Sequence, residues 1–105
     1  MKRERKWHDL MPLSDLAPDD VTPARLGRLD LAVYRTSAGV FVSLARCSHQ
    51  GANLCYGYFD GFTIECPLHQ GLFDVRTGKA LAAPATRPIR MLECRVNDGM
   101  VQVLR

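Results

Sequence analysis

The stretch CSHQGANLCYGYFDGFTIECPLHQG, residues 47–71, contains the tripeptide His-Gln-Gly twice, each time shortly behind a cysteine. As a pattern it reads Cys-x-His, sixteen residues, then Cys-x-x-His, which singles out Cys47, His49, Cys66 and His69. Thiolates and imidazoles are common ligands of zinc and of iron-sulfur clusters. The two boxes therefore predict a metal centre that is held by two matching loops.

A tetrahedral zinc ion is one interpretation of these four residues. Zinc sites favour Cys-x2-4-Cys and His-x3-5-His pairs, however, and the spacing of a Cys-x-His pair is unfavourable for two ligands of one ion. The alternative is a 2Fe-2S cluster in which Cys47 and Cys66 bind one iron while His49 and His69 bind the other. Each loop then gives one ligand to each iron, which explains why the boxes match, so the pattern favours the cluster.

Glycines and a proline accompany the candidate ligands. Gly51 and Gly71 close the two boxes, and we expect them to adopt positive φ and to bring N–H groups close to the bridging sulfides. Pro67 directly follows the second cysteine and is expected to stiffen its loop. Ordinary turn chemistry explains any one of these glycines alone, and it is the joint pattern that favours a cluster site.

The segments on either side of this region predict antiparallel β-structure. Apolar residues alternate over residues 29–36 and 39–45, which are joined by the turn TSAG, and again over 88–96 and 100–105, which are joined by the strong turn signal NDG. Residues 12–20 allow one helical turn at most, because prolines bracket it. An all-β fold follows, in which an insert over about residues 46–84, rich in ligands and with short strands at most, carries the function.

Composition restricts the class of protein. A chain of 105 residues with 47% hydrophobic residues fits one soluble domain, and no apolar run is long enough to span a membrane. The net charge of +3 resides in the first six residues, so we expect no nucleic-acid binding and either a solvated tail or a docking role there. Without a secretory signal, the expected compartment is the reducing cytoplasm, where Cys55 and Cys94 would be small core residues rather than half-cystines.

The two boxes, continued by QGLFDVRTGKAL (70–81) and PATRPI (84–89), resemble those of the Rieske-type ferredoxins of aromatic ring-hydroxylating dioxygenases, of the naphthalene and biphenyl dioxygenase kind. The resemblance covers nearly the whole chain. It implies a single Rieske domain over residues 1–105, an antiparallel β-sandwich with an inserted cluster-binding subdomain, and it carries the four ligands over position by position. One departure is charge, because many such ferredoxins are acidic and this chain is slightly basic at its start.

The function implied by the resemblance is one-electron transfer rather than catalysis. The partners would be a flavin-dependent NAD(P)H reductase and a terminal oxygenase, both bound transiently by a monomer. The residue content is consistent with a carrier that is not an enzyme. The chain has no Ser-His-Asp grouping and no phosphate-binding glycine loop, and His8 is the one histidine left for a second iron site. Two alternatives stay open: a fixed small subunit of a nitrite-reductase-like enzyme, and a structural zinc domain.

Overall fold

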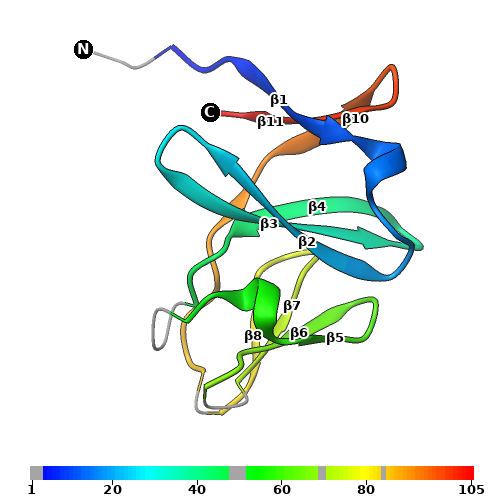
Figure 1. Cartoon of the computed structure of the whole chain (residues 1–105). Coiled ribbons are helices and arrows are strands. Elements are labelled where there is room, and N and C mark those ends of the chain that lie inside the picture. Colours follow the sequence, from blue (N-terminus) through cyan, green and yellow to red (C-terminus); the bar gives the residue numbers. More distant parts are fainter. Residues whose placement is uncertain (1–3, 48–51, 69–70, 84) are drawn as a thin grey trace.

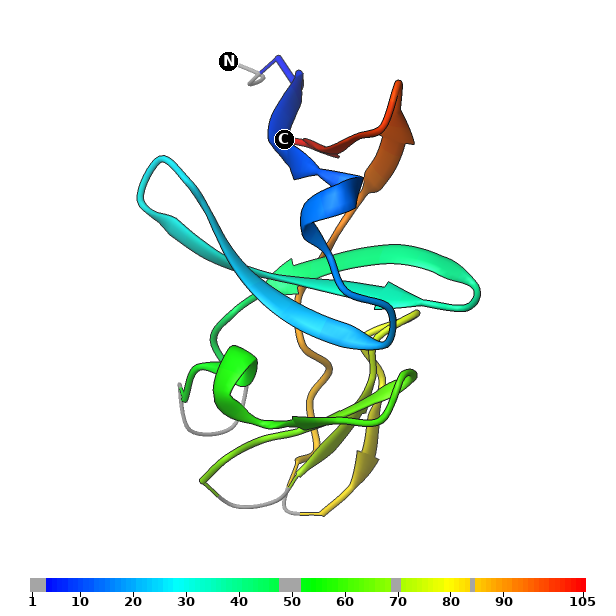
Figure 2. The same cartoon turned by 45° about the vertical axis from the view of Figure 1, so that its right-hand side comes forward.

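The computed structural model describes residues 4–47, 52–68, 71–83 and 85–105. Their strands form three antiparallel sheets that lie one above another as layers (Figure 1). The view in Figure 2 separates the layers and shows that β1 and β11, the first and last strands, both lie in the upper sheet. Within these described ranges, no helix has the length and hydrophobicity needed to cross a bilayer.

Each sheet is built from short strands. The upper sheet has the order β1 (Trp7–Pro12), β11 (Met100–Leu104), β10 (Cys94–Asn97). The middle sheet has the order β2 (Asp20–Leu26), β3 (Leu29–Thr36), β4 (Gly39–Leu44), β9 (Met91–Leu92). The lower sheet has the order β5 (Tyr58–Phe59), β6 (Thr63–Glu65), β7 (Leu72–Asp74), β8 (Ala80–Ala82). Two single turns of 3-10 helix, η1 (Leu13–Asp15) and η2 (Leu54–Tyr56), connect strands.

Strand β3 lies at the centre of the molecule because both of its faces are buried. Leu31 and Val33 face the upper sheet and share an apolar cluster with Val101 and Val103. The alternate residues Ala32 and Tyr34 face the lower sheet and belong to a second apolar cluster, whose buried members also include Ile64, Phe73 and Val75. The period-2 geometry of a strand thus lets β3 hold the insert against the sandwich.

The structure confirms the two predicted hairpins and the single helical turn. Residues 29–36 and 39–44 pair as β3 and β4. The NDG turn joins β10 to β11 with Asp98 at φ 50° and Gly99 at φ 74°, the paired positive values of a type I′ turn. Strand β2 tolerates Pro23 because it is an edge strand, with β3 as its only neighbour in the sheet.

Two expectations about regular structure were wrong. The continuous strand predicted over 88–96 is split, because β9 pairs with β4 in the middle sheet whereas β10 pairs with β11 in the upper one. Glu93 lies at the crossing, and its backbone carbonyl accepts a hydrogen bond from the Leu104 N–H at 2.9 Å. The insert is also more regular than expected, since β5 to β8 form a complete four-stranded sheet.

Candidate metal centre

The two candidate cysteines occupy equivalent backbone positions. Cys47 follows β4 and Cys66 follows β6, and both are almost fully buried, with 2% and 1% of their surface exposed. The Cys47 N–H donates to the Ala52 carbonyl at 2.7 Å, and the Cys66 N–H donates to the Gly71 carbonyl at 2.8 Å. In both cases the acceptor lies five residues beyond the cysteine, so the two loops are closed in the same way at their bases.

The base of the first loop is held by the residues that follow it. Arg46 and Asn53 form an antiparallel bridge, and the Leu54 N–H donates to the Ala45 carbonyl at 2.7 Å. The side-chain oxygen of Asn53 accepts the Cys55 N–H at 2.9 Å, which caps η2. Asn53 was not singled out in the sequence, although an Asn directly before a helical turn is a known capping signal.

The second loop closes the β6–β7 hairpin, in which Glu65 pairs with Leu72. The positive φ expected at Gly71 depends on Gln70, which lies outside the described residues, so it stays a prediction. The structure needs this glycine for space, because an added Cβ would lie 2.8 Å from the Cβ of Ala85. Gly57 has the same role, since its Cβ would run into the carbonyl oxygen of Glu65. Gly51 lies outside the described residues.

Both cysteines belong to the apolar cluster between the middle and lower sheets. Tyr34 and Ser43 bring polar groups into this core. Ser43 Oγ donates to the Leu44 carbonyl at 2.9 Å, so it accepts the hydrogen bond from the Tyr34 hydroxyl, also at 2.9 Å. Burial raises the pKa of Tyr34 well above its usual value, which keeps the phenol neutral. The two thiols are therefore presented from an apolar, ordered environment.

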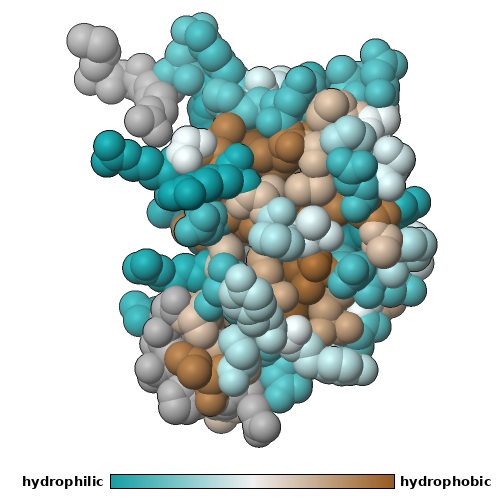
Figure 3. Space-filling view, viewed as in Figure 1, coloured by the Kyte–Doolittle hydropathy of each residue, from teal (hydrophilic) through white to brown (hydrophobic). Residues whose placement is uncertain are grey.

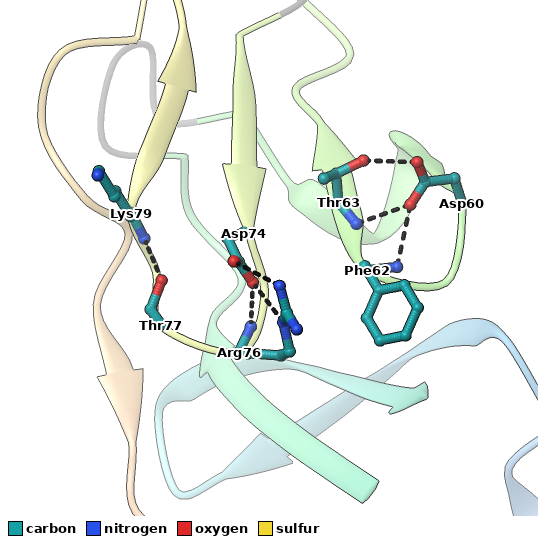
Figure 4. Close-up of polar contacts among 7 residues, drawn as sticks. All are labelled: Asp60, Phe62, Thr63, Asp74, Arg76, Thr77 and Lys79. Carbon is teal, nitrogen blue, oxygen red and sulfur yellow. Dashed lines mark hydrogen bonds and ion pairs between the residues drawn. The ribbon is translucent and has the colours of Figure 1, made fainter. Parts of the chain in front are cut away.

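The opposite ends of the lower hairpins are held by polar turns (Figure 4). Asp60 accepts hydrogen bonds from the N–H groups of Phe62 and Thr63, at 2.9 and 2.7 Å, and these bonds lower the pKa of its carboxyl. Asp74 binds Arg76, whose guanidinium lies 5.0 Å from the centre of the Phe62 ring. The turns thus fix the hairpins from which the second loop projects.

The structure brings Cys47 and Cys66 into one cluster, whereas His49 and His69 lie outside the described residues. The full set of four ligands accordingly stays a prediction. The observed donors fit a 2Fe-2S cluster, because two buried cysteines stand at the same position of two similarly closed loops, and each loop contains one of the histidines.

The remaining cysteines are set apart from this arrangement. Cys55 and Cys94 are only half-buried, yet each packs against an apolar cluster as expected of a small hydrophobic residue. Cys94 Sγ donates to the Val40 carbonyl at 3.1 Å. Burial raises the pKa of Cys55 to about 11, which makes its thiol unreactive near neutral pH.

Further aromatic and basic side chains lie in the core and on the strands around it. Phe73 is fully buried in the core, while Trp7 and Phe41 are half-buried. His8 lies on β1, an edge strand. Arg46 is exposed directly beside Cys47.

A family model described as the Rieske [2Fe-2S] domain matches residues 6–96. The chain belongs to the Rieske [2Fe-2S] domain family. Among its relatives is the anthranilate 1,2-dioxygenase ferredoxin subunit of Burkholderia cepacia, which is 39% identical over 93% of this chain and 91% of the relative. The ferredoxin component of the naphthalene 1,2-dioxygenase system of Pseudomonas putida is 38% identical over 93% of this chain and 94% of the relative.

Solved Rieske structures have the same architecture. The ferredoxin of Sphingomonas yanoikuyae B1 is 34% identical, with a TM-score of 0.89 over 95% of this chain and 99% of that chain. A chain from the complex of oxygenase and ferredoxin in carbazole 1,9a-dioxygenase is 37% identical, with a TM-score of 0.85 over 92% of this chain and 91% of that chain. A putative nitrite reductase small subunit is only 20% identical at a TM-score of 0.79, so it shares the Rieske fold and supports nothing further.

Proposed function

We propose that this protein is a one-electron carrier that delivers electrons to a terminal aromatic-ring-hydroxylating oxygenase. The observation that carries the proposal is the pair of buried cysteines, Cys47 and Cys66, at the bases of two loops closed by equivalent hydrogen bonds. The relatives that match over nearly their whole length are named as ferredoxin components of dioxygenase systems, which are electron-transfer subunits rather than catalytic ones. A fixed subunit of a nitrite-reductase-like enzyme is the distant alternative.

In this proposal Cys47 and Cys66 bind one iron of a Rieske cluster, and His49 and His69 bind the other. The cluster supplies one-electron redox chemistry, and neutral imidazoles in place of two thiolates raise its potential above that of an all-cysteine cluster. The single domain would span residues 1–105, with the cluster-binding subdomain over about residues 46–84. The lower sheet lies within the latter range, which supports this division.

The partners proposed are an oxygenase and a flavin-dependent NAD(P)H reductase. A solved relative is described as a complex of oxygenase and ferredoxin, which supports the first of them. A carrier that visits two partners in turn has to dissociate, so we propose a cytoplasmic monomer with small, transient interfaces, below about 1,200 Å².

The cluster is tested by metal analysis of protein produced anaerobically with ample iron. We expect about two irons and two acid-labile sulfides per chain. Exchange of His49 or His69 for alanine should abolish the Rieske absorption and electron paramagnetic resonance spectra, whereas exchange of His8, on its edge strand, should leave them unchanged. Stoichiometric zinc without sulfide would overturn the proposal in favour of a zinc domain.

The shuttle role is tested by reconstitution with a reductase and an oxygenase encoded beside this chain. Amounts of the protein far below those of the oxygenase should support many turnovers, since a carrier is used repeatedly. Size-exclusion chromatography of the mixture should recover the protein alone. Recovery of a salt-resistant, stoichiometric complex with one large subunit would instead favour the fixed-subunit alternative.

A further inference from the structure

The two ends of the middle sheet carry opposite charge. Antiparallel pairing places the β2–β3 turn, the exit from β4 and the entry to β9 at one end. The charged residues of these segments are the basic Arg25, Arg28, Arg46 and Arg90 and the acidic Asp30, and Glu4, Lys6 and Arg105 line a separate pocket with Gly27 of the same turn. The other end carries Asp19, Asp20 and Asp60, with Arg35 bound to the Leu16 carbonyl. The basic end is also the end from which the first cysteine loop leaves β4.

A surface cavity of about 340 Å³ lies at the basic end. Arg28 lines it from the β2–β3 turn, and Arg46 and Asn53 line it from the base of the first cysteine loop. Figure 3 shows strongly hydrophilic side chains projecting from the edge where Figure 1 places the β2–β3 turn. The cavity thus shares Ala45, Arg46 and Asn53 with the base of the loop that carries Cys47.

The positive charge of the cavity is only partly compensated within the described residues. Asp30 also lines the cavity, but its ion pair, at 3.7 Å, is with Arg25. In the described part of the chain no ion pair involves Arg28 or Arg46. The side-chain oxygen of Asn53 is occupied by the Cys55 N–H, which leaves its amide nitrogen as a further donor.

The segment that follows Asn53 in the chain carries exposed aromatic side chains. Tyr56 of η2 is 81% exposed, and Tyr58 of β5 is 70% exposed. Tyrosine and arginine are the residue types enriched at energetically important positions of protein interfaces. Arginine also suits carboxylates, because its planar guanidinium can donate two parallel hydrogen bonds to one carboxylate group.

We propose that the cavity formed by Arg28, Arg46 and Asn53 receives a carboxylate from an acidic surface of an electron-transfer partner. This proposal rests on the proposed function, because it names the chemistry of the partner. Contact at Arg46 would place the partner directly beside Cys47, where a short path for the electron is needed. Charge complementarity would also accelerate the encounter at low ionic strength.

Binding is tested with the peptide hexaglutamate and the ¹⁵N-labelled, oxidised protein. The Arg28 and Arg46 Nε–Hε signals, assigned by exchange to glutamine, should shift and saturate at low salt. The signal of Arg76, which is already paired with Asp74, should stay unchanged. Hexalysine should have no effect. A six-nucleotide DNA that shifts the same signals as strongly would overturn the assignment to a carboxylate partner.

Charge-matched variants separate this site from the general charge of the protein. The double variant Arg28→Gln/Arg46→Gln should weaken hexaglutamate binding on the order of tenfold. Lys79→Gln, at the far end of the β7–β8 hairpin (Figure 4), should change it by less than about twofold, since salt and distance screen that charge. If removing the charge of Lys79 weakens hexaglutamate binding as much as removing one charge at Arg28 or Arg46, the proposal is overturned. These measurements need no electron transfer, so their failure is distinguishable from failure of the proposed function.

A kinetic measurement extends the test to the reduced protein. Oxidation by the anion hexacyanoferrate(III) should slow about tenfold at low ionic strength in the double variant, while oxidation by the cation tris(phenanthroline)cobalt(III) should not slow. The unchanged visible spectrum of the variant would show that the fold and cluster are intact. Equal slowing with both reagents would contradict a local positive field beside Cys47.

Discussion

Gly71 and Ala85 form a contact between the second cysteine loop and the segment that leads back to the sandwich. An alanine Cβ at position 71 would lie 2.8 Å from the Cβ and 3.3 Å from the nitrogen of Ala85. Gly71→Ala therefore tests this packing. Overpacking of this kind typically costs 1–3 kcal/mol, and we expect the free energy of unfolding to fall by about 2 kcal/mol.

The exchange Ala85→Gly should relieve this overlap. Alone, it removes a buried methyl group and adds backbone freedom to the unfolded chain, which together cost about 1.5 kcal/mol. If the sites were independent, the double variant would lose about 3.5 kcal/mol. Because the Cβ–Cβ overlap is gone in the double variant, we expect a loss of only about 1.5 kcal/mol, a coupling of about 2 kcal/mol.

The assay is thermal unfolding of the iron-loaded proteins, scanned at one rate and followed by circular dichroism. A loss of 1 kcal/mol corresponds to about 4–8 °C in Tm for a domain of this size. Gly71→Ala should therefore lower Tm by roughly 10 °C, and adding Ala85→Gly should lower it no further. As a control, Ala85→Gly should be additive with Gly39→Ala, which strains the backbone at φ 125° but whose Cβ would meet nothing within 4 Å. A Tm of the double variant that falls by the sum of the two single effects would refute the reasoning.

Three further predictions concern side chains around the same core. Ser43→Ala should lower the free energy of unfolding in urea more than Tyr34→Phe does. Ser43→Ala leaves the buried Tyr34 hydroxyl without its acceptor, which costs about 1–3 kcal/mol, whereas Tyr34→Phe leaves Ser43 bonded to the Leu44 carbonyl. The reverse order would contradict the hydrogen-bond directions. Cys55, with its pKa raised to about 11, should react with iodoacetamide at pH 8 on the order of a hundredfold more slowly than a thiol of pKa 9, and mass spectrometry showing rapid labelling would argue against this burial. Two backbone N–H groups lower the pKa of the Asp60 carboxyl, so the carboxylate stabilises the fold at pH values above the unfolded pKa, which is near 4. Asp60→Asn should therefore lower Tm at pH 7 but not at a pH below the folded pKa, where both side chains are neutral. An equal difference in Tm at both pH values would contradict a charge effect.

Local features could be predicted from the sequence because their causes lie within a few residues. Alternating side chains identified the β3–β4 hairpin, and the NDG turn was recognised because both of its central residues need positive φ. The cysteine and histidine boxes indicated the cluster chemistry for a similar reason, since ligand type and spacing restrict the metal centre. The matching hydrogen bonds at Cys47 and Cys66 agree with that interpretation of the repeated box.

Other features depend on contacts between segments that are distant in the chain. Strand 88–96 looks continuous in the sequence, but β4 and β11 compete for it, so it divides between two sheets. Gly71 looks like a turn glycine in the sequence, but the structure also needs a glycine there because Ala85 packs against it. The local sequence predicts neither the division of strand 88–96 nor the contact with Ala85.

Hydrophobic period, turn residues and ligand spacing are local properties, so the sequence predicted an all-β chain with two matching cysteine boxes, and its resemblance to Rieske-type ferredoxins implied the family. The side chains that surround the cysteine loops depend instead on how distant strands pair. Arg28 and Arg46 are separated by two strands in the sequence, and antiparallel pairing brings both to one cavity beside Cys47. A net charge of +3 says nothing of this arrangement, because the electrostatic field of a protein depends on where its charges lie in space.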